Sequence, residues 1–167
     1  MPMTVYRSVK TSKSEDYQQK QKSSKQRKSF VPSRELAAQI VEAMQEKKGS
    51  DIVVMDMREV SGVSDYFVLC TGSSDLQIKA IIDHIRKTIK EKAGESPWSV
   101  EGEEHRQWVL MDYVDVVAHV LSPEKRAFYG LERLWGDAPM EAVEAGQEKV
   151  ALLQENPAQE ETTSSET

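Results

Sequence analysis

Two short apolar runs near the middle of the chain constrain its fold most strongly. Ile52–Met55 is apolar throughout, and Tyr66–Cys70 follows after a mostly polar link. A strand that is apolar at consecutive positions is typical of the centre of a sheet, where both faces are buried. The link, residues 58–65, is too short for a crossover helix, so we expect the two strands to be antiparallel.

Helical periodicity precedes and follows these two strands. Apolar residues recur from Leu36 to Met44 at the spacing of one helix face. After the second strand, Ser74 and Gln77 have the spacing of a capping box, and Gly94 ends the helix that begins there. We expect the buried face of this second helix to consist of Leu76, Ile78, Ile81, Ile82, Ile85 and Ile89.

The segment after Gln107 predicts a hairpin and a third helix. Trp108–Met111 and Val116–Leu121 read as two strands around a turn at 113–114. Ser122 followed by Pro123 is typical of a helix start. We expect this helix to bury Ala127, Phe128, Leu131 and Leu134.

With a further short strand at 98–100, these elements predict a single α/β domain over residues 32–139. Its sheet should be mixed, with about five strands, and flanked by helices. Residues 1–31 are polar and rich in Ser, Lys and Gln, so we expect a disordered basic extension. Residues 140–167 should form an acidic tail that is partly helical to about residue 153 and disordered beyond it.

The net charge of −6 is unevenly distributed along the chain. Residues 1–30 carry a net charge of +6, whereas 31–140 and 141–167 carry −6 each. An acidic domain repels the phosphates of bare nucleic acid, so a basic protein is the better matched partner. The basic arm at the N-terminus leaves open a separate contact with RNA.

Cysteine content and hydropathy indicate the compartment. Cys70 is the single cysteine, which excludes an internal disulfide, and no apolar stretch approaches the length of a membrane span. The basic, Ser-rich start resembles an organelle transit peptide, but Glu15 and Asp16 interrupt it. We predict a cytoplasmic protein with no membrane contact.

Gly72-Ser73, at a strand-to-helix turn, is the one motif that suggests catalysis. Nucleotidyltransferases hold phosphate at such a turn, but they also need a closely spaced pair of acids to bind two metal ions. No such pair follows here, the histidines lack metal-ligand spacing, and Cys70 has no activating neighbour. We therefore predict no catalytic residue, metal or cofactor, and a helix cap at Gly72-Ser73.

Polar residues interrupt the predicted hairpin. Trp108, Leu110 and Asp112 share one face of their strand, and His119 lies inside the return strand. Two interpretations are open: a docking face anchored by Trp108, or a core tryptophan with Asp112 capping the turn. The acidic loop 100–105 is either a rim for basic side chains of a partner or a solvated connection.

Five segments, in this order and spacing, resemble the Iojap-like ribosomal silencing factors, the RsfS family. The resemblance covers about residues 33–139 and neither tail. The segments are D-I-V-V-M-D from Asp51, S-D-Y-F-V-L-C-T-G-S-S from Ser64, V-E-G from Val100, W-V-L-M-D-Y-V-D-V-V-A-H-V from Trp108 and R-A-F-Y-G-L-E-R-L-W-G-D-A-P from Arg126.

The resemblance implies a sheet similar to the nucleotidyltransferase fold without its catalytic acids. It also implies a translational repressor that binds the fourteenth protein of the large-subunit series, at the face where the small subunit docks. The bound factor would block subunit joining when nutrients are scarce, and it often forms homodimers. The alternatives are an assembly factor or adaptor for the large subunit and, less favoured, a nucleotidyltransferase-like enzyme.

The resemblance also implies which residues contact the ribosomal protein. Two positions depart from the family pattern: Val114 stands where glycine is usual, and Leu121 where phenylalanine is usual. Because a β-branched residue tolerates positive φ poorly, we expect the turn to be reshaped. The predicted binding residues are Trp108, Leu110, Asp112, Tyr113, Asp115, His119, Glu101, Gly102, Asp65 and Tyr66.

Overall fold

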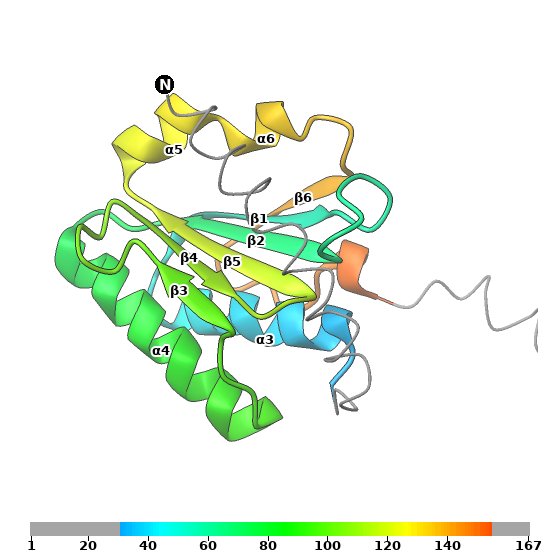
Figure 1. The fold of residues 1–167 in the computed structure, drawn as a ribbon, viewed down its shortest axis with the longest axis horizontal. Coiled ribbons are helices and arrows are strands. Elements are labelled where there is room, and N and C mark those ends of the chain that lie inside the picture. The colour runs from blue at the N-terminus through cyan, green and yellow to red at the C-terminus, as the bar shows by residue number, and fades with distance from the viewer. Residues whose placement is uncertain (1–30, 155–167) are drawn as a thin grey trace, which may run out of the picture.

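The structure, a computed structural model, describes residues 31–154 as a six-stranded mixed sheet with helices on both faces (Figure 1). The strands are β1 (Ser50–Asp56), β2 (Tyr66–Thr71), β3 (Ser99–Glu101), β4 (Trp108–Asp112), β5 (Val116–Leu121) and β6 (Met140–Val143). The helices are α3 (Ser33–Glu46), α4 (Asp75–Ala93), α5 (Pro123–Tyr129) and α6 (Leu131–Leu134), with a 3-10 turn, η1 (Ala151–Leu153).

The strand order is β3-β4-β5-β2-β1-β6, which places the apolar runs at the centre. β1 and β2 are antiparallel and β4 and β5 form an antiparallel hairpin, as predicted. β2 and β5 are parallel, so the sheet is mixed, and every residue of both strands is buried. The predicted α/β class with a mixed, helix-flanked sheet is confirmed.

The sheet separates a large core from a smaller one. α3 and α4 cover one face, where Val54, Val68, Val109 and Ala118 meet the apolar stripes of both helices. The short helices α5 and α6 cover the other face, where Phe67, Leu69 and Leu121 pack against Leu131 (Figure 1). Because α5 and α6 are short, this second face is only partly covered, which leaves room for a site.

α4 begins and ends as predicted, with one correction on its buried face. Ser74 Oγ accepts a hydrogen bond from the Gln77 N–H at 3.1 Å, and Gly94 ends the helix with φ of 68°. Leu76, predicted to be buried, is 77% exposed. It precedes Ile78 by two residues, about 200° around the helix, and so lies opposite the buried stripe.

The third predicted helix is in fact two helices. Gly130, with φ of 52°, ends α5 and reorients the chain into α6. Leu131 is buried as predicted and Leu134 is half-buried, but α5 buries none of its residues. The prediction that Ala127 and Phe128 are buried is therefore wrong, and the Phe128 side chain is 68% exposed.

The helical run expected after Pro139 is also wrong, because β6 pairs there with β1. The sheet thus has six strands rather than about five, and it extends beyond residue 139. The Glu141 carboxylate accepts hydrogen bonds from the N–H groups of Ala151 and Leu152, which holds η1 against α3. Of the two predicted tails, residues 1–30 and 155–167 lie outside the described part, whereas Val31 is buried.

Candidate functional site

The ten predicted binding residues fall into two groups joined by β4. Tyr66 begins β2, and Asp65 hydrogen-bonds to the turn between β4 and β5, so one group gathers at a single end of the sheet. The turn group consists of Asp65, Tyr66, Asp112, Tyr113 and Asp115. The strand group consists of Glu101, Gly102, Trp108, Leu110 and His119.

The strand group lies on the sparsely covered face and at the adjoining edge of the sheet. Trp108 and Leu110 belong to the smaller core but remain half-buried rather than enclosed. Glu101 pairs with Leu110 through β3, the edge strand, and is itself half-buried. The group therefore combines apolar surface with a carboxylate at the rim.

The indole of Trp108 is held from two sides. Its Nε1 donates a hydrogen bond to His119 Nδ1 at 3.1 Å. Its ring packs on Tyr129 of α5, with centroids 4.5 Å apart, and Tyr129 meets the exposed Phe128 edge-on at 5.4 Å. Trp108 is thus neither an enclosed core residue nor a loose surface residue, and its orientation is fixed.

His119 is fully buried, with 0% of its surface exposed, so it cannot touch a partner directly. Burial lowers the pKa of His119 to about 3, and the nearby Arg126 guanidinium acts in the same direction. The ring is therefore neutral at pH 7. Because Nδ1 accepts from Trp108, the proton resides on Nε2, which has no hydrogen-bond partner among residues 31–154.

Gly102 supports Trp108 through its backbone. Its φ is 87°, and a Cβ added there would lie 2.1 Å from the Trp108 carbonyl oxygen. Only glycine permits this close approach of the loop to the start of β4. The residue thus has a packing role, which its predicted place in the binding site did not anticipate.

Gly102→Ala should lower the free energy of unfolding by about 2–3 kcal/mol, because positive φ and the clash with Trp108 act together. Chemical denaturation would measure the loss. Gly146→Ala is the matched control, since Gly146 has φ of 77° but open space around its Cβ position. An equal loss in the two variants would show that the clash contributes nothing.

The turn group is tied together by backbone hydrogen bonds. The Asp115 carbonyl accepts from the N–H groups of Asp65, at 2.7 Å, and Tyr66, at 3.2 Å. Asp112 is buried, and its Oδ1 accepts from the Val114 N–H at 2.8 Å. The capping interpretation of Asp112 therefore describes its geometry, and its substitution would disturb the turn.

Val114 adopts positive φ although it is β-branched. Val114 has φ of 74°, and the Asp115 N–H donates to the Tyr113 carbonyl at 3.0 Å, which is the pattern of a γ-turn. The Asp112 cap and the two anchoring bonds from β2 hold this conformation even though the residue is β-branched. Backbone strain at Val114 is the result.

Val114→Gly should therefore raise the free energy of unfolding by about 1 kcal/mol, because glycine adopts positive φ without strain. A thermal or urea unfolding curve would measure the gain. Val63→Gly, in the β1–β2 loop at a residue without positive φ, should destabilise instead. A loss of stability in Val114→Gly would contradict the assignment of strain.

Burial separates the remaining residues of the turn group. Asp65 and Asp115 are half-buried, whereas Tyr66 and Tyr113 are buried. Burial raises the pKa of Tyr113, whose hydroxyl has no hydrogen-bond partner in the described part of the chain. Of the acidic members, Asp65 and Asp115 are therefore more exposed than Asp112.

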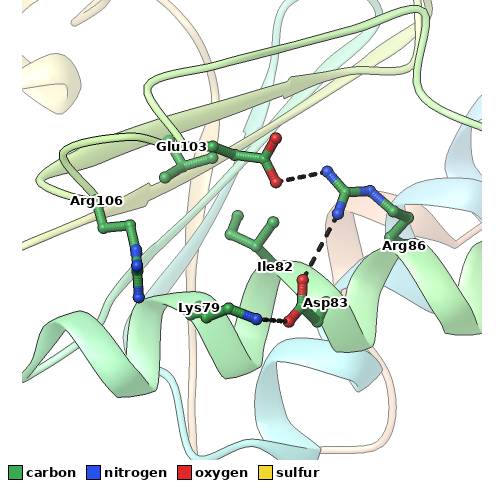
Figure 2. A pocket seen from close by; sticks show the side chains of 7 residues that line it. Lys79, Ile82, Asp83, Arg86, Glu103 and Arg106 are labelled. Atoms are coloured by element: carbon green, nitrogen blue, oxygen red, sulfur yellow. Dashed lines mark hydrogen bonds and ion pairs between the residues drawn. The ribbon is translucent and has the colours of Figure 1, made fainter.

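A groove between α4 and the β3–β4 loop, with a volume of about 280 Å³, lies on the α4 side of the sheet, the face opposite Trp108 and Leu110 (Figure 2). Arg86 of α4 spans it, with Nη2 at 2.7 Å from Glu103 and Nη1 at 3.6 Å from Asp83. Lys79 meets the same Asp83 carboxylate at 2.7 Å. These ion pairs fasten the loop that carries Gly102 to the helix.

The catalytic alternative finds little support in the geometry. The Ser73 N–H and hydroxyl both donate to the Gln77 side chain, at 2.6 and 2.7 Å, so the Gly72-Ser73 turn is occupied by the protein itself. Burial raises the pKa of the Cys70 thiol to about 12, which keeps it protonated. Within residues 31–154, no three His, Cys, Asp or Glu side chains gather around a metal-sized space.

No helix within residues 31–154 is long and apolar enough to cross a bilayer.

Sequence reasoning missed the contribution of α5 to the site. Tyr129 stacks on Trp108, and Arg126 fastens α5 to the sheet through Thr71 Oγ1 at 3.1 Å and the Asp51 carbonyl at 2.9 Å. Arg126 also pairs with Glu132 at 2.6 Å. The adjacent Phe128 and Tyr129 gave no decisive signal, because neighbouring helical residues can both face a core, as Ile81 and Ile82 do in α4.

The fold and the site together define a small α/β binding domain, with a fixed tryptophan on a half-covered sheet. The family described as "Ribosomal silencing factor during starvation" (RsfS) matches residues 31–167. The chain belongs to this family.

Individual relatives agree with the family match. A ribosomal silencing factor RsfS from Halalkalibacterium halodurans is 39% identical over 109 residues, which are 65% of this chain and 92% of the relative. A crystal structure from Chromobacterium violaceum superposes with a TM-score of 0.61 at 34% identity, covering 71% of this chain and 98% of the other. A mouse protein named "Mitochondrial assembly of ribosomal large subunit protein 1" is 30% identical over 58% of this chain and 43% of its own length.

Proposed function

We propose that this protein represses translation by binding the large ribosomal subunit through the strand and turn groups, which prevents the small subunit from joining. The observation that carries the proposal is Trp108, half-exposed on the sheet yet fixed by His119 and Tyr129. A rigid tryptophan at the centre of a patch is a common energetic anchor of protein interfaces. Family membership supports a ribosomal setting.

The partner that we propose is the fourteenth protein of the large-subunit series, at the face where the small subunit docks. Ribosomal proteins are generally basic because they lie against RNA, and residues 31–140 carry a net charge of −6. Asp65 and Asp115 in the turn group and Glu101 in the strand group would meet its cations. Charges at a rim mainly accelerate and orient association, so we assign most of the affinity to Trp108 and Leu110.

The proposed mechanism needs no chemical step. The bound domain occupies volume that the small subunit requires, so inhibition should follow the fraction of large subunits occupied. Repression would then rise with the concentration of the factor when nutrients are limited. We place this activity in the cytoplasm.

Sucrose-gradient analysis of purified subunits mixed with the protein tests this proposal. At saturating factor, the large subunit should carry the protein and the peak of joined subunits should decrease in proportion to occupancy. If subunits still join when the large subunit is fully occupied, the proposed repression is wrong.

The second candidate function is assembly of the large subunit, which the name of the mouse relative favours. An assembly factor would leave immature large subunits when it is removed, whereas a repressor would leave them intact. Subunit profiles of cells lacking the protein distinguish the two. The enzymatic alternative predicts metal-dependent binding of ATP, which calorimetry would detect.

Two finer elements of the proposal concern the termini and the oligomer. We propose that the basic residues 1–30 contact ribosomal RNA and that the protein forms a homodimer when free. Deletion of 1–30 should then weaken ribosome binding and reduce its dependence on salt. Sedimentation equilibrium of the free protein measures the oligomeric state.

A further inference from the structure

His119 is a polar residue at a position where the sheet would accept an apolar one. It lies in β5 between Leu69 of β2 and Leu110 of β4, and it is wholly buried. Phe67 packs on its ring, with centroids 4.9 Å apart. A hydrocarbon side chain would fit this environment without burying any polar atom.

The imidazole does have one specific partner, the side chain of Trp108. Trp108 Nε1 donates to His119 Nδ1 at 3.1 Å, and the two rings are inclined by 38°. The indole has a single donor, so this bond fixes which edge of the ring faces the sheet. The opposite edge of the indole then faces the half-covered side of the sheet.

Tyr129 completes the arrangement from the other side. Its ring lies 4.5 Å from that of Trp108 and is inclined by 52°. This tilted ring contact by itself restricts the plane of the indole but does not distinguish its two edges. The hydrogen bond to His119 supplies that distinction.

We infer that His119 is a positioning residue, which sets the orientation of Trp108 for docking without contacting the partner itself. The inference rests on the proposed docking role of the strand group. Its physical basis is pre-organisation: an anchor already held in its bound orientation loses less conformational freedom when the complex forms. The imidazole accepts this bond although its second nitrogen has no hydrogen-bond partner within residues 31–154.

Two substitutions separate the hydrogen bond from the packing. His119→Phe keeps a ring and removes the acceptor, whereas His119→Asn removes the ring and keeps an oxygen near the position of Nδ1. For folded variants, we expect His119→Phe to weaken binding to purified large subunits about tenfold. His119→Asn should bind within about threefold of the wild type, even though it is the less stable protein. A purely structural role predicts the reverse order.

The indole N–H resonance of Trp108 gives a readout that does not depend on the ribosome. It can be assigned as the signal missing from Trp108→Phe, and it should shift and exchange faster with solvent in His119→Phe. Trp108→Phe should itself weaken binding, and adding His119→Phe should then have little further effect, because the positioned donor is already gone. This arm keeps the test decisive if His119→Asn fails to fold.

The outcomes distinguish the inference from the function on which it rests. Wild-type affinity in His119→Phe, together with impaired Trp108→Ala, would overturn the positioning role and leave the docking surface standing. Additive losses in the double variant would also overturn it. Wild-type affinity in both His119→Phe and Trp108→Ala would overturn the docking role of the strand group, and the positioning role with it.

Discussion

Replacing Trp108 with alanine should weaken binding to isolated large subunits about a hundredfold, which corresponds to about 2.7 kcal/mol. The substitution removes the largest half-exposed apolar side chain of the strand group and leaves a hollow beside Tyr129. Since no other residue of the group combines exposure with a fixed orientation, the remaining contacts cannot compensate. Co-sedimentation with large subunits over a range of protein concentrations measures the loss.

The comparison needs a control for folding, because Trp108 also contributes to the smaller core. Met140→Ala is a matched truncation: Met140 is an exposed apolar residue of β6, at the opposite edge of the sheet from β3. It should bind large subunits as the wild type does. A folded Trp108→Ala protein that also co-sediments like the wild type would exclude the strand group as the docking surface.

Asp112 illustrates why exposure has to be known before a site variant is chosen. From its place in the hairpin, Asp112→Lys would be as direct a test of docking as Trp108→Ala. The carboxylate, however, is buried and accepts a hydrogen bond from the Val114 N–H, so lysine there would disrupt the turn. Loss of binding in that variant would not distinguish docking from folding.

The centre of the fold could be predicted from sequence because burial on both faces leaves a local signature. Each signal that revealed it extends over only a few residues. These signals are the apolar runs of β1 and β2, the short link between them and the helix cap at Ser74. β6 leaves no such signature. It is a short edge strand with one buried residue, Val143, and its partner β1 lies far earlier in the chain.

The candidate site was predictable in its membership but not in its exposure. Alternation along β4 correctly placed Trp108 and Leu110 on one face, but alternation does not say what covers that face. The covering elements are α5 and α6, whose break at Gly130 exposes Phe128 and turns Tyr129 toward Trp108. His119 is therefore buried on this face, whereas Tyr113 is buried in the larger core on the other face of the sheet.

Acid should destabilise the protein through His119. The pKa of His119 is about 3 in the folded state, because of burial first and Arg126 second, and about 6.5 in the unfolded chain. Between these values the unfolded state binds a proton that the folded state does not. Well above pH 6.5 His119 is neutral in both states and does not affect the free energy of unfolding. As the pH falls below 6.5, the free energy of unfolding decreases by about 1.4 kcal/mol per pH unit because of this residue.

From pH 6.5 to 4.5 the contribution of His119 should decrease by about 2 kcal/mol, because the unfolded residue is already half protonated at pH 6.5. Carboxylates titrate in the same range, so the quantity to measure is the difference in slope between the wild type and His119→Phe in urea unfolding at each pH. Equal slopes in the wild type and His119→Phe would mean that His119 takes up a proton in the folded state, which is incompatible with a neutral ring accepting from Trp108.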